Sequence, residues 1–393
     1  MILVGIDVGK FKHSFSITDK YTGELLVEPK FFDNNLNGFK FLTQCLSSYN
    51  KSDFLIGMED TGHYHFALLK YLLDQSYSVA LINPVTTNLT RKMQGGSAKN
   101  DSLDTMTICD VLASNQRKKN YRITTVDNFN LYEQKLLTRH HHNLKEEINV
   151  YANRLQKCID VVFPEFNSLF KSKYGLVYMK ILKKFGSAYK IANTNIQTIR
   201  KCFETGKGRT ISLTAEQLKE AAKHSVGFNS ISDEIQIKHL IAQIELINEQ
   251  IEEIDKKIEE FSTKTNSPII TIPGISHFSG TSILAELGDI NNYSSPAKII
   301  KFAGVEPIVY ESSTYAAQHT AITKKGSKYL RKTLYQIITP VISHNEVFKN
   351  FYLLKRSQGK SHRCAQGHCI RKLLRVIYHL ETTGQTFDPS LLR

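Results

Sequence analysis

The chain of 393 residues lacks the features that define several classes of protein. No apolar run approaches the roughly 18 residues of a membrane-spanning helix, and the short N-terminal run contains Asp7 and lacks a signal-peptide pattern. The six cysteines are scattered, without a CxxC pair or the spacing of a disulfide framework. These absences favour a protein of a reducing cytoplasm with no membrane partner. The length allows two or three domains.

Acidic residues are scarce toward the C-terminus, and most of the net charge of +14 lies there. Residues 321–393 contain fourteen Lys or Arg against three acids. The basic residues of a helix often form only its solvated face, but basic residues that lie this close together favour a surface that binds nucleic acid. Two clusters carry this prediction: Lys324, Lys325, Lys328, Arg331 and Lys332, and then Arg371, Lys372 and Arg375.

Four carboxylates stand at positions where they can converge. Asp7 and Glu59 each close a short apolar run of the strand type, and Asp101 and Asp104 stand three apart at the start of a predicted helix, on one face of it. Each acid alone can be an ordinary strand end or a helix cap. Convergent carboxylates repel one another, so we expect two divalent cations, Mg²⁺ or Mn²⁺, to neutralise them. Such a site suits phosphodiester chemistry.

The order of predicted elements supports convergence. The apolar patterns predict strands at 2–7, 13–19, 25–32, 53–59 and 78–83, and helices at 35–48, 64–75 and 100–114. The order βββαβαβα is that of the ribonuclease H topology, with the acids at the tips of the first and fourth strands and on the final helix. We therefore predict an α/β ribonuclease H-like domain over residues 1–120, which ends where NQRKKNYR, residues 115–122, reads as a basic linker.

The middle of the chain, residues 121–265, is predicted to be helical. One long helix covers 129–162 and stops before Pro164. Its three consecutive histidines, His140 to His142, point in different directions, which favours surface or packing roles over a shared metal. Apolar residues then alternate at spacings of 3 and 4 from Ile237 to Phe261, the pattern of a coiled-coil seam. The seam can pair with the first helix, with a second subunit, or with both. Residues 173–227 form a mostly helical insert without evident chemistry.

The C-terminal region, residues 266–393, is predicted to be mostly helical, with helices at 296–302, 328–342 and 365–382. Its first segment, TIPGISHFSGTSILAELGDI, reads as turn, helix, turn and resembles a helix-hairpin-helix that grips a DNA phosphate, with Ser276 in place of the usual second glycine. A zinc site is a weaker alternative for four residues of this region: His362, Cys364, His368 and Cys369. Their spacing fits no standard zinc knuckle, so packing and DNA contacts are the favoured roles.

Several motifs together resemble a known family. In order, they are MILVGIDVGK, MEDTGHYH, LINP with a basic loop and KNDSLD, then TIPGIS, AELGDI, FAGVEP, SS and ITKKGSKYLRKTL. This series resembles the IS110 insertion-sequence transposases and the related site-specific DNA invertase Piv. The resemblance covers roughly residues 1–160 and 265–390.

The resemblance implies a RuvC-like catalytic domain, a coiled-coil arm and a C-terminal transposase domain with a serine nucleophile. Carried over by position, the metal-binding DEDD tetrad is Asp7, Glu59, Asp101 and Asp104. Asp60 points the other way on a strand and is left out. The family's serine follows the proline of GVEP by five residues, which gives Ser312. The next residue is Ser313 rather than the usual glycine, so either hydroxyl remains a candidate.

The resemblance also implies partners and an activity. The implied activity is that of a recombinase that transposes an insertion sequence. Its implied partners are donor and target DNA and a structured noncoding guide RNA. The implied assembly is a dimer or tetramer in the prokaryotic cytoplasm, near the nucleoid. In such a scheme base pairing reads the sequence while the protein holds backbones. Two alternatives remain: a metal-dependent junction nuclease in which water attacks, and a nucleic-acid-binding protein without catalysis.

Overall fold

The computed structural model describes residues 1–60, 62–93, 101–114, 121–204, 212–308, 311–312, 315–316 and 321–391. At 101–102, 127–128, 311–312 and 315–316 it describes the backbone alone. The chain forms two compact units. The first comprises residues 1–134, 284–326 and 371–383, and the second comprises residues 135–283, 327–370 and 384–393.

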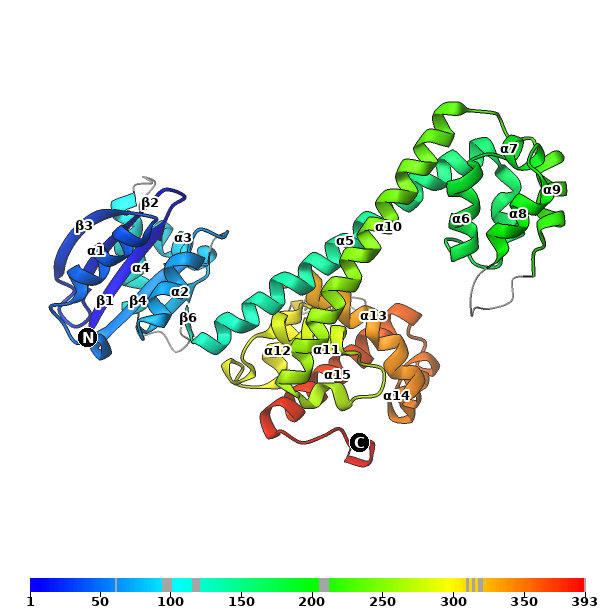
Figure 1. Cartoon of the computed structure of the whole chain (residues 1–393). Helices are drawn as coiled ribbons and strands as arrows, with labels where there is room; N and C mark the ends of the chain where they lie inside the picture. The colour runs from blue at the N-terminus through cyan, green and yellow to red at the C-terminus, as the bar shows by residue number, and fades with distance from the viewer. Residues whose placement is uncertain are drawn as a thin grey trace. The chain divides into compact units, whose positions relative to one another are not determined.

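A six-stranded mixed sheet dominates the N-terminal part of the first unit (Figure 1). Its order is β3-β2-β1-β4-β5-β6, where β1 pairs in parallel with β4, β4 in parallel with β5, and the remaining pairs are antiparallel. This is the predicted ribonuclease H-like arrangement. The strands are β1 (Ile2–Val8), β2 (Lys12–Asp19), β3 (Leu25–Asp33), β4 (Phe54–Glu59), β5 (Val79–Ile82) and β6 (Tyr121–Thr124).

Helices cover both faces of this sheet because its central strands are apolar on both sides. Even-numbered residues of β1 and β4, such as Ile6 and Ile56, share a core with α1 (Leu36–Leu46) and α2 (Phe66–Asp74). Odd-numbered residues, such as Leu3 and Leu55, pack with α4 (Asp101–Ala113). Side chains alternate along a strand, so the parity of a residue decides which helix layer it meets.

Several elements were not predicted from the sequence, among them one strand and two helices. Strand β6 begins inside residues 115–122, the predicted basic linker, and pairs with β5. Helix α3 (Pro84–Met93) replaces the expected basic loop, and α14 (Glu346–Ser357) lies between two predicted helices. Each of these two helices buries a single residue, Thr87 or Phe348, so neither contributes much to a core.

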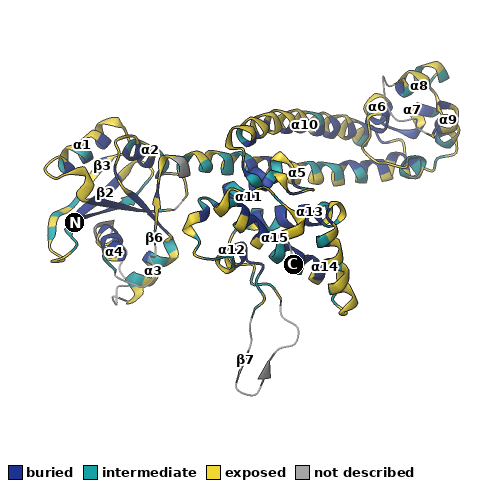
Figure 2. Ribbon diagram, turned by 90° about the horizontal axis from the view of Figure 1, so that it is seen from below, coloured by how far each residue is buried: buried dark blue, intermediate teal, exposed yellow. Residues whose placement is uncertain are grey.

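The two long helices, α5 (Val126–Val162) and α10 (Ile231–Thr265), lie side by side and antiparallel (Figures 1 and 2). The predicted seam from Ile237 to Ile258 is buried, and Phe261 is half-buried. Seam residues share cores with Leu144 and Ile159 of α5, so the seam is used within the chain. Between these helices come α6 (Leu176–Phe185), α7 (Ala188–Ala192), α8 (Ile196–Phe203) and α9 (Ala215–Lys223), which form a helical module on a shared core.

The histidine triplet on α5 is divided between the surface and packing contacts, the two roles that the sequence predicted. His140 is exposed. The ring of His141 is buried, with its centroid 4.0 Å from that of Phe278. His142 is also buried, with its ring centroid 5.3 Å from that of Phe278 and Nε2 3.0 Å from the hydroxyl of Thr333.

The remaining elements are α11 (His277–Leu287), α12 (Pro296–Ala303), β7 (Glu311–Ser312), β8 (Tyr315–Ala316), α13 (Lys328–His344) and α15 (His362–Thr383). The predicted helices of this region are present, with bounds within a few residues. Across the parts of the chain that the structure describes, no helix combines the length and apolarity needed to cross a membrane.

Acid should weaken the fold through His141. Burial is the main cause that lowers the pKa of His141 from 6.5 to about 4, assisted by the charges of Lys145, Lys332 and His140, although Asp255 lies 3.3 Å from Nε2. Between these two pKa values the unfolded chain binds more protons than the folded one, so stability falls as the pH drops through that window. We expect His141→Gln to reduce the loss of stability between pH about 7 and about 4.5, measured by urea unfolding. His140→Gln, at an exposed site, should leave the loss unchanged; equal slopes in all three proteins would contradict this role.

Candidate functional site

Asp7 and Glu59 lie at the same edge of the sheet. Strands β1 and β4 are parallel, and their last paired residues are Ile6 and Met58, so the two acids follow next to each other at the carboxyl ends. Both are odd-numbered residues of their strands and therefore belong to the face that α4 covers. Asp60 follows β4; its carboxylate is half-exposed and lies 3.7 Å from Nε2 of His65.

A pair of glycines brings α4 against these strands. Gly5 and Gly57 are direct neighbours in the sheet. A Cβ atom on Gly5 would lie 2.0 Å from the carbonyl oxygen of Thr105, and one on Gly57 would lie 2.8 Å from Leu112. Only a residue without a side chain permits so close an approach of helix and strand.

The direction of α4 places its acids near the strand ends. Thr105 lies over Gly5, and one turn later the thiol of Cys109 lies 3.8 Å from the carbonyl of Leu3. The helix therefore runs opposite to β1, and its first turn lies toward the edge that carries Asp7. Asp104 is buried in that turn. Asp101 begins the helix, and its side chain lies outside the described atoms.

Helix α3 contacts two of the acids. The hydroxyl of Thr87 hydrogen-bonds to the carboxylate of Glu59, and one turn later the guanidinium of Arg91 forms an ion pair with Asp104. Arg91 and Asp104 are largely shielded from solvent, with side-chain exposures of 20% and 9%. A buried cation beside a buried carboxylate offsets the cost of desolvating each. The edge thus already contains one positive charge.

The residues at this edge suit a divalent cation. Their donors are carboxylate oxygens, the ligands that hard cations prefer, and Arg91 shows that the edge accommodates positive charge. Nε of Arg91 is buried without a hydrogen-bond partner among the described atoms, so the guanidinium is only partly satisfied there. Within the described side chains no three His, Cys, Asp or Glu residues lie close enough to hold a metal ion. Asp101, the remaining candidate ligand, is not part of that set.

Sequence patterns missed three residues of this edge. Thr87 and Arg91 were placed in a loop, although their spacing of four fits one face of a helix. Ser14 of β2 pairs directly with Asp7 and is buried. Nothing in the sequence marks Ser14, because its position depends on the register between β1 and β2.

Ser312 lies on a hairpin whose base is well defined. In β7 it pairs with Tyr315 of β8. Ser313, the alternative hydroxyl, lies outside the described residues. Below the hairpin the two chain segments are joined by backbone hydrogen bonds: Ile308 N–H to Ala321 O at 2.8 Å and Thr323 N–H to Glu306 O at 3.0 Å.

Two glycines close this base. Gly304 and Gly326 both have positive φ, at 64° and 88°. A Cβ atom on Gly304 would lie 2.0 Å from the carbonyl oxygen of Lys325, and one on Gly326 would lie 1.9 Å from that of Phe302. The glycines of FAGVEP and ITKKGSK therefore hold these two motifs together in space.

The predicted basic clusters are partly exposed. Lys324, Lys325 and Lys328 are exposed just before or at the start of α13. Arg331 and Lys332 are half-buried, and Lys332 forms an ion pair of 2.9 Å with Glu146. In the second cluster, on α15, Arg375 is exposed, whereas Arg371 and Lys372 are half-buried.

Two family profiles match the chain. Residues 4–164 match a profile described as a transposase of the IS110 DEDD type, and residues 266–353 match the transposase IS116/IS110/IS902 family. The first range includes all four acids, and the second includes Ser312. The matches fall on the two regions where the motifs occur.

Individual proteins of known name are also similar. A mini-circle protein of Streptomyces coelicolor, named as a transposase for IS117, is 23% identical over 405 residues, which cover 99% of this chain and 96% of that protein. Pilin gene-inverting proteins of Moraxella bovis and Moraxella lacunata are each 25% identical over 126 residues, 32% of this chain and 39% of theirs.

Replacing Gly5 by alanine should separate α4 from the sheet. The added methyl group overlaps the backbone of Thr105, which cannot rotate away as a side chain can. We expect a loss of about 2–3 kcal/mol in the free energy of unfolding, measured in urea. Gly175→Ala is the control, because nothing lies within 4 Å of its Cβ position and its φ of −72° is ordinary. Equal stability of both variants would show that the contact between α4 and β1 is not tight.

Removing the positive charge of Arg91 should change how the edge responds to divalent cations. Arg91→Met keeps much of the side-chain volume but leaves Asp104 without its ion-pair partner, so the protein should be less stable in EDTA. Because no guanidinium then competes for the carboxylate, added Mg²⁺ or Mn²⁺ should raise Tm by at least ~3 °C more than in the parent. Lys92→Met removes an exposed charge from the same helix and should behave like the parent. A metal-induced rise that is the same in all three would exclude competition at Asp104.

Proposed function

Because the chain belongs to the IS110 family of transposases, which are DNA-cleaving enzymes of the DEDD type, we propose that it cuts and rejoins DNA at a composite site. One part is a divalent-metal site formed by Asp7, Glu59, Asp101 and Asp104. The other is the hydroxyl of Ser312. The observation that carries the proposal is the arrangement at one sheet edge, where the glycine pair brings α4 to the strand ends and α3 contacts both Glu59 and Asp104.

The proposed step is a transesterification. Oγ of Ser312 attacks a DNA phosphorus, its proton passes to a nearby base, and the bond to the leaving sugar oxygen breaks as that oxygen gains a proton. One phosphodiester is replaced by a phosphoserine ester, so a free hydroxyl of another strand can reverse the step and restore the serine. Divalent cations bound by the four acids would supply stabilisation of negative charge at the phosphate. The acids hold those cations, and Ser14 and Thr87 position the acids.

A hairpin is a suitable support for this nucleophile. Its base is fixed by Gly304, Gly326 and the backbone hydrogen bonds between their segments. Ser312 pairs across it with Tyr315. A nucleophile on such a support can enter a DNA groove while the helices behind it keep their packing. Lys324 and Lys325, which follow the hairpin, are suited to neutralise phosphate charge.

The proposed partners follow from charge and family. The clusters of α13 and α15 are expected to bind donor and target DNA through phosphates. A structured noncoding RNA would provide sequence recognition by base pairing, and the active assembly would be a dimer or tetramer. We propose three functional regions: 1–120 for metal-dependent catalysis, 121–265 for the arm, and 266–393 for the serine and nucleic-acid contacts.

Replacing Ser312 by alanine should abolish covalent attachment of the protein to DNA. The purified variant is incubated with labelled donor DNA, Mg²⁺ and the RNA transcribed from the sequence beside the gene, then run on a denaturing gel. We expect a denaturation-resistant adduct with the parent and with Ser313→Ala, and at least a ~100-fold loss with Ser312→Ala, because only one hydroxyl forms the ester.

The matched outcomes separate the alternatives. An adduct that survives in Ser312→Ala but not in Ser313→Ala would move the nucleophile to position 313. Strand cleavage without any adduct, in the parent and both variants, would indicate a nuclease in which water attacks. Asp7→Asn serves as the control for the metal site, since it should bind DNA in a gel shift but neither cleave it nor form the adduct.

A further inference from the structure

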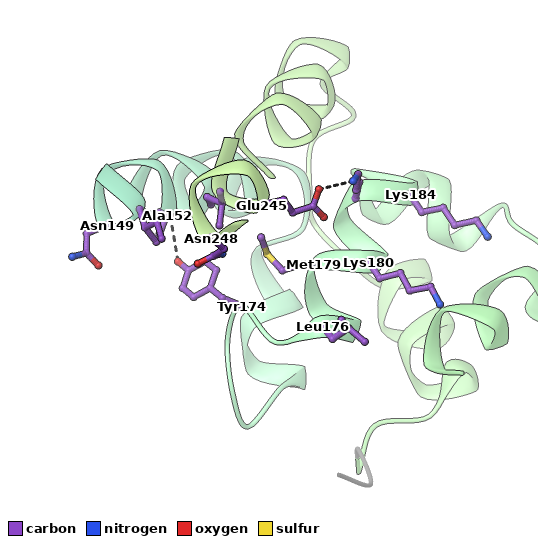
Figure 3. A pocket seen from close by; sticks show the side chains of 12 residues that line it. Asn149, Ala152, Tyr174, Leu176, Met179, Lys180, Lys184, Glu245 and Asn248 are labelled. Atoms are coloured by element: carbon purple, nitrogen blue, oxygen red, sulfur yellow. Dashed lines mark hydrogen bonds and ion pairs between the residues drawn. The ribbon is translucent and has the colours of Figure 1, made fainter. Parts of the chain in front are cut away.

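A cavity of about 940 Å³ lies where the helical module joins the long helices α5 and α10 (Figure 3). One wall consists of Ile148 and Ala152 of α5 with Ile244 of α10, and the other of Leu176 and Met179 of α6. Together these two walls form the apolar surface of the cavity, called its apolar floor below. None of the cavity's lining residues belongs to the acid site or to the serine hairpin. Its size is within the range of about 300–1,000 Å³ typical of small-molecule sites.

The rim of the cavity is polar and carries a net positive charge. Lys183 is paired with Glu245 at 2.5 Å, so these two charges offset each other. Lys180 and Lys184 instead donate to backbone carbonyls of the α8 region, to Lys201 O at 2.9 Å and Thr198 O at 3.4 Å. A neutral carbonyl does not cancel an ammonium charge, so two positive charges remain beside the cavity, on the side that faces α8.

The whole module is basic. Residues 163–230 contain twelve Lys or Arg against four Glu. The module therefore favours an anionic partner. It also contributes α6, whose exposed lysines line the cavity.

Tyr174 supplies an aromatic ring at the cavity in an unusual backbone conformation. Its φ of 61° lies in the left-handed region, which a residue with a bulky side chain rarely adopts. The hydroxyl lies 3.3 Å from the carbonyl oxygen of Ala152, which ties the loop before α6 to the arm (Figure 3). Strained residues are held in place by their surroundings and concentrate at functional sites. Here the strain positions an aromatic side chain beside an apolar floor.

We propose that this cavity binds one nucleotide turned out of a single-stranded nucleic acid. The base lies on the apolar floor beside Tyr174, and the amide of Asn248 faces its polar edge. The adjoining phosphate lies toward Lys180 and Lys184. An apolar floor, an aromatic ring and a cationic rim are the elements by which proteins bind unpaired strands. A base-paired nucleotide does not fit, because its edge and both faces are already occupied.

This inference goes beyond the proposed function and uses from it only that the chain works on nucleic acid. The two can fail separately. The metal-site variant Asp7→Asn retains every residue of the cavity and should bind the nucleotide normally even though it does not cleave DNA. Conversely, a protein with a filled cavity should still form the serine adduct on a short duplex.

Photo-cross-linking of the full chain tests the proposal, because the cross-linked peptide distinguishes binding at this cavity from binding at the C-terminal basic clusters. The probes are a 15-residue RNA, the single-stranded and duplex DNA of the same sequence, and the free mononucleotide, each carrying 4-thiouracil. Cross-linked peptides are then identified by mass spectrometry. The expected product joins the single-stranded probe to the peptide that contains Tyr174 or Met179.

Three variants provide the comparison. Asn248→Trp, at an exposed position of α10, fills the cavity without touching the core. The double change Lys180→Ala/Lys184→Ala removes the rim charges. The double change Lys219→Ala/Lys223→Ala is the matched control, since these lysines have the same spacing on α9, and neither lines the cavity.

We expect cross-linking at Tyr174 or Met179 to fall about tenfold in the first two variants and by less than about twofold in the control. The preferred probe, RNA, single-stranded DNA or mononucleotide, then identifies the source of the nucleotide. An equal loss of cross-linking in the control would show that the effect comes from the general positive charge of the module, and it would overturn the proposed nucleotide site. So would undiminished cross-linking in Asn248→Trp, equal cross-linking of the duplex, or the absence of this product with every probe.

Discussion

The candidate active site depends on the contact between α4 and the two central parallel strands. Acids from β1, β4 and α4 can share one edge only if the helix lies unusually close to the sheet, and Gly5 beside Gly57 allows this. The same approach brings negative charges together, and like charges in a partly buried place repel. Helix α3 opposes that repulsion, since Arg91 pairs with Asp104 and Thr87 hydrogen-bonds to Glu59. The arrangement therefore holds the acids in place, as the proposed metal site requires.

The candidate catalytic residues and the long helices lie in different parts of the chain. The proposed metal ligands stand on strands and on a packed helix, where backbone hydrogen bonding and burial fix them. The serine stands on a hairpin closed by Gly304 and Gly326, and extended contacts are left to the long pair α5 and α10. Apolar residues at alternating spacing bury the seam of that pair within the chain, which makes a stiff support for the module of α6 to α9. A stiff arm with a basic module is suited to hold a strand of nucleic acid.

The low sequence identity between this chain and its relatives is consistent with a fold that depends on few positions. The IS117 protein is 23% identical yet aligned over nearly the whole chain. The fold and the proposed site make special demands on few residues of this chain: acids at two strand ends, glycines where backbones touch, and acids in one helical turn. Most other positions need only be apolar on the correct face. Such positions can change while the layers remain.

From the sequence alone, the order of elements, the ribonuclease H-like fold and the long helices were predictable, because each carries a strong apolar period. The acids at the strand ends and helix start were predictable as candidates, since strand ends and a spacing of three are local properties. Helix α3 and strand β6 were not, because their residues are mostly polar or exposed and their formation depends on neighbours. Only the tertiary structure placed Ser14 opposite Asp7, Arg91 on Asp104, and the cavity beside Tyr174. Those relations join residues distant in the chain, and packing decides them rather than any local preference.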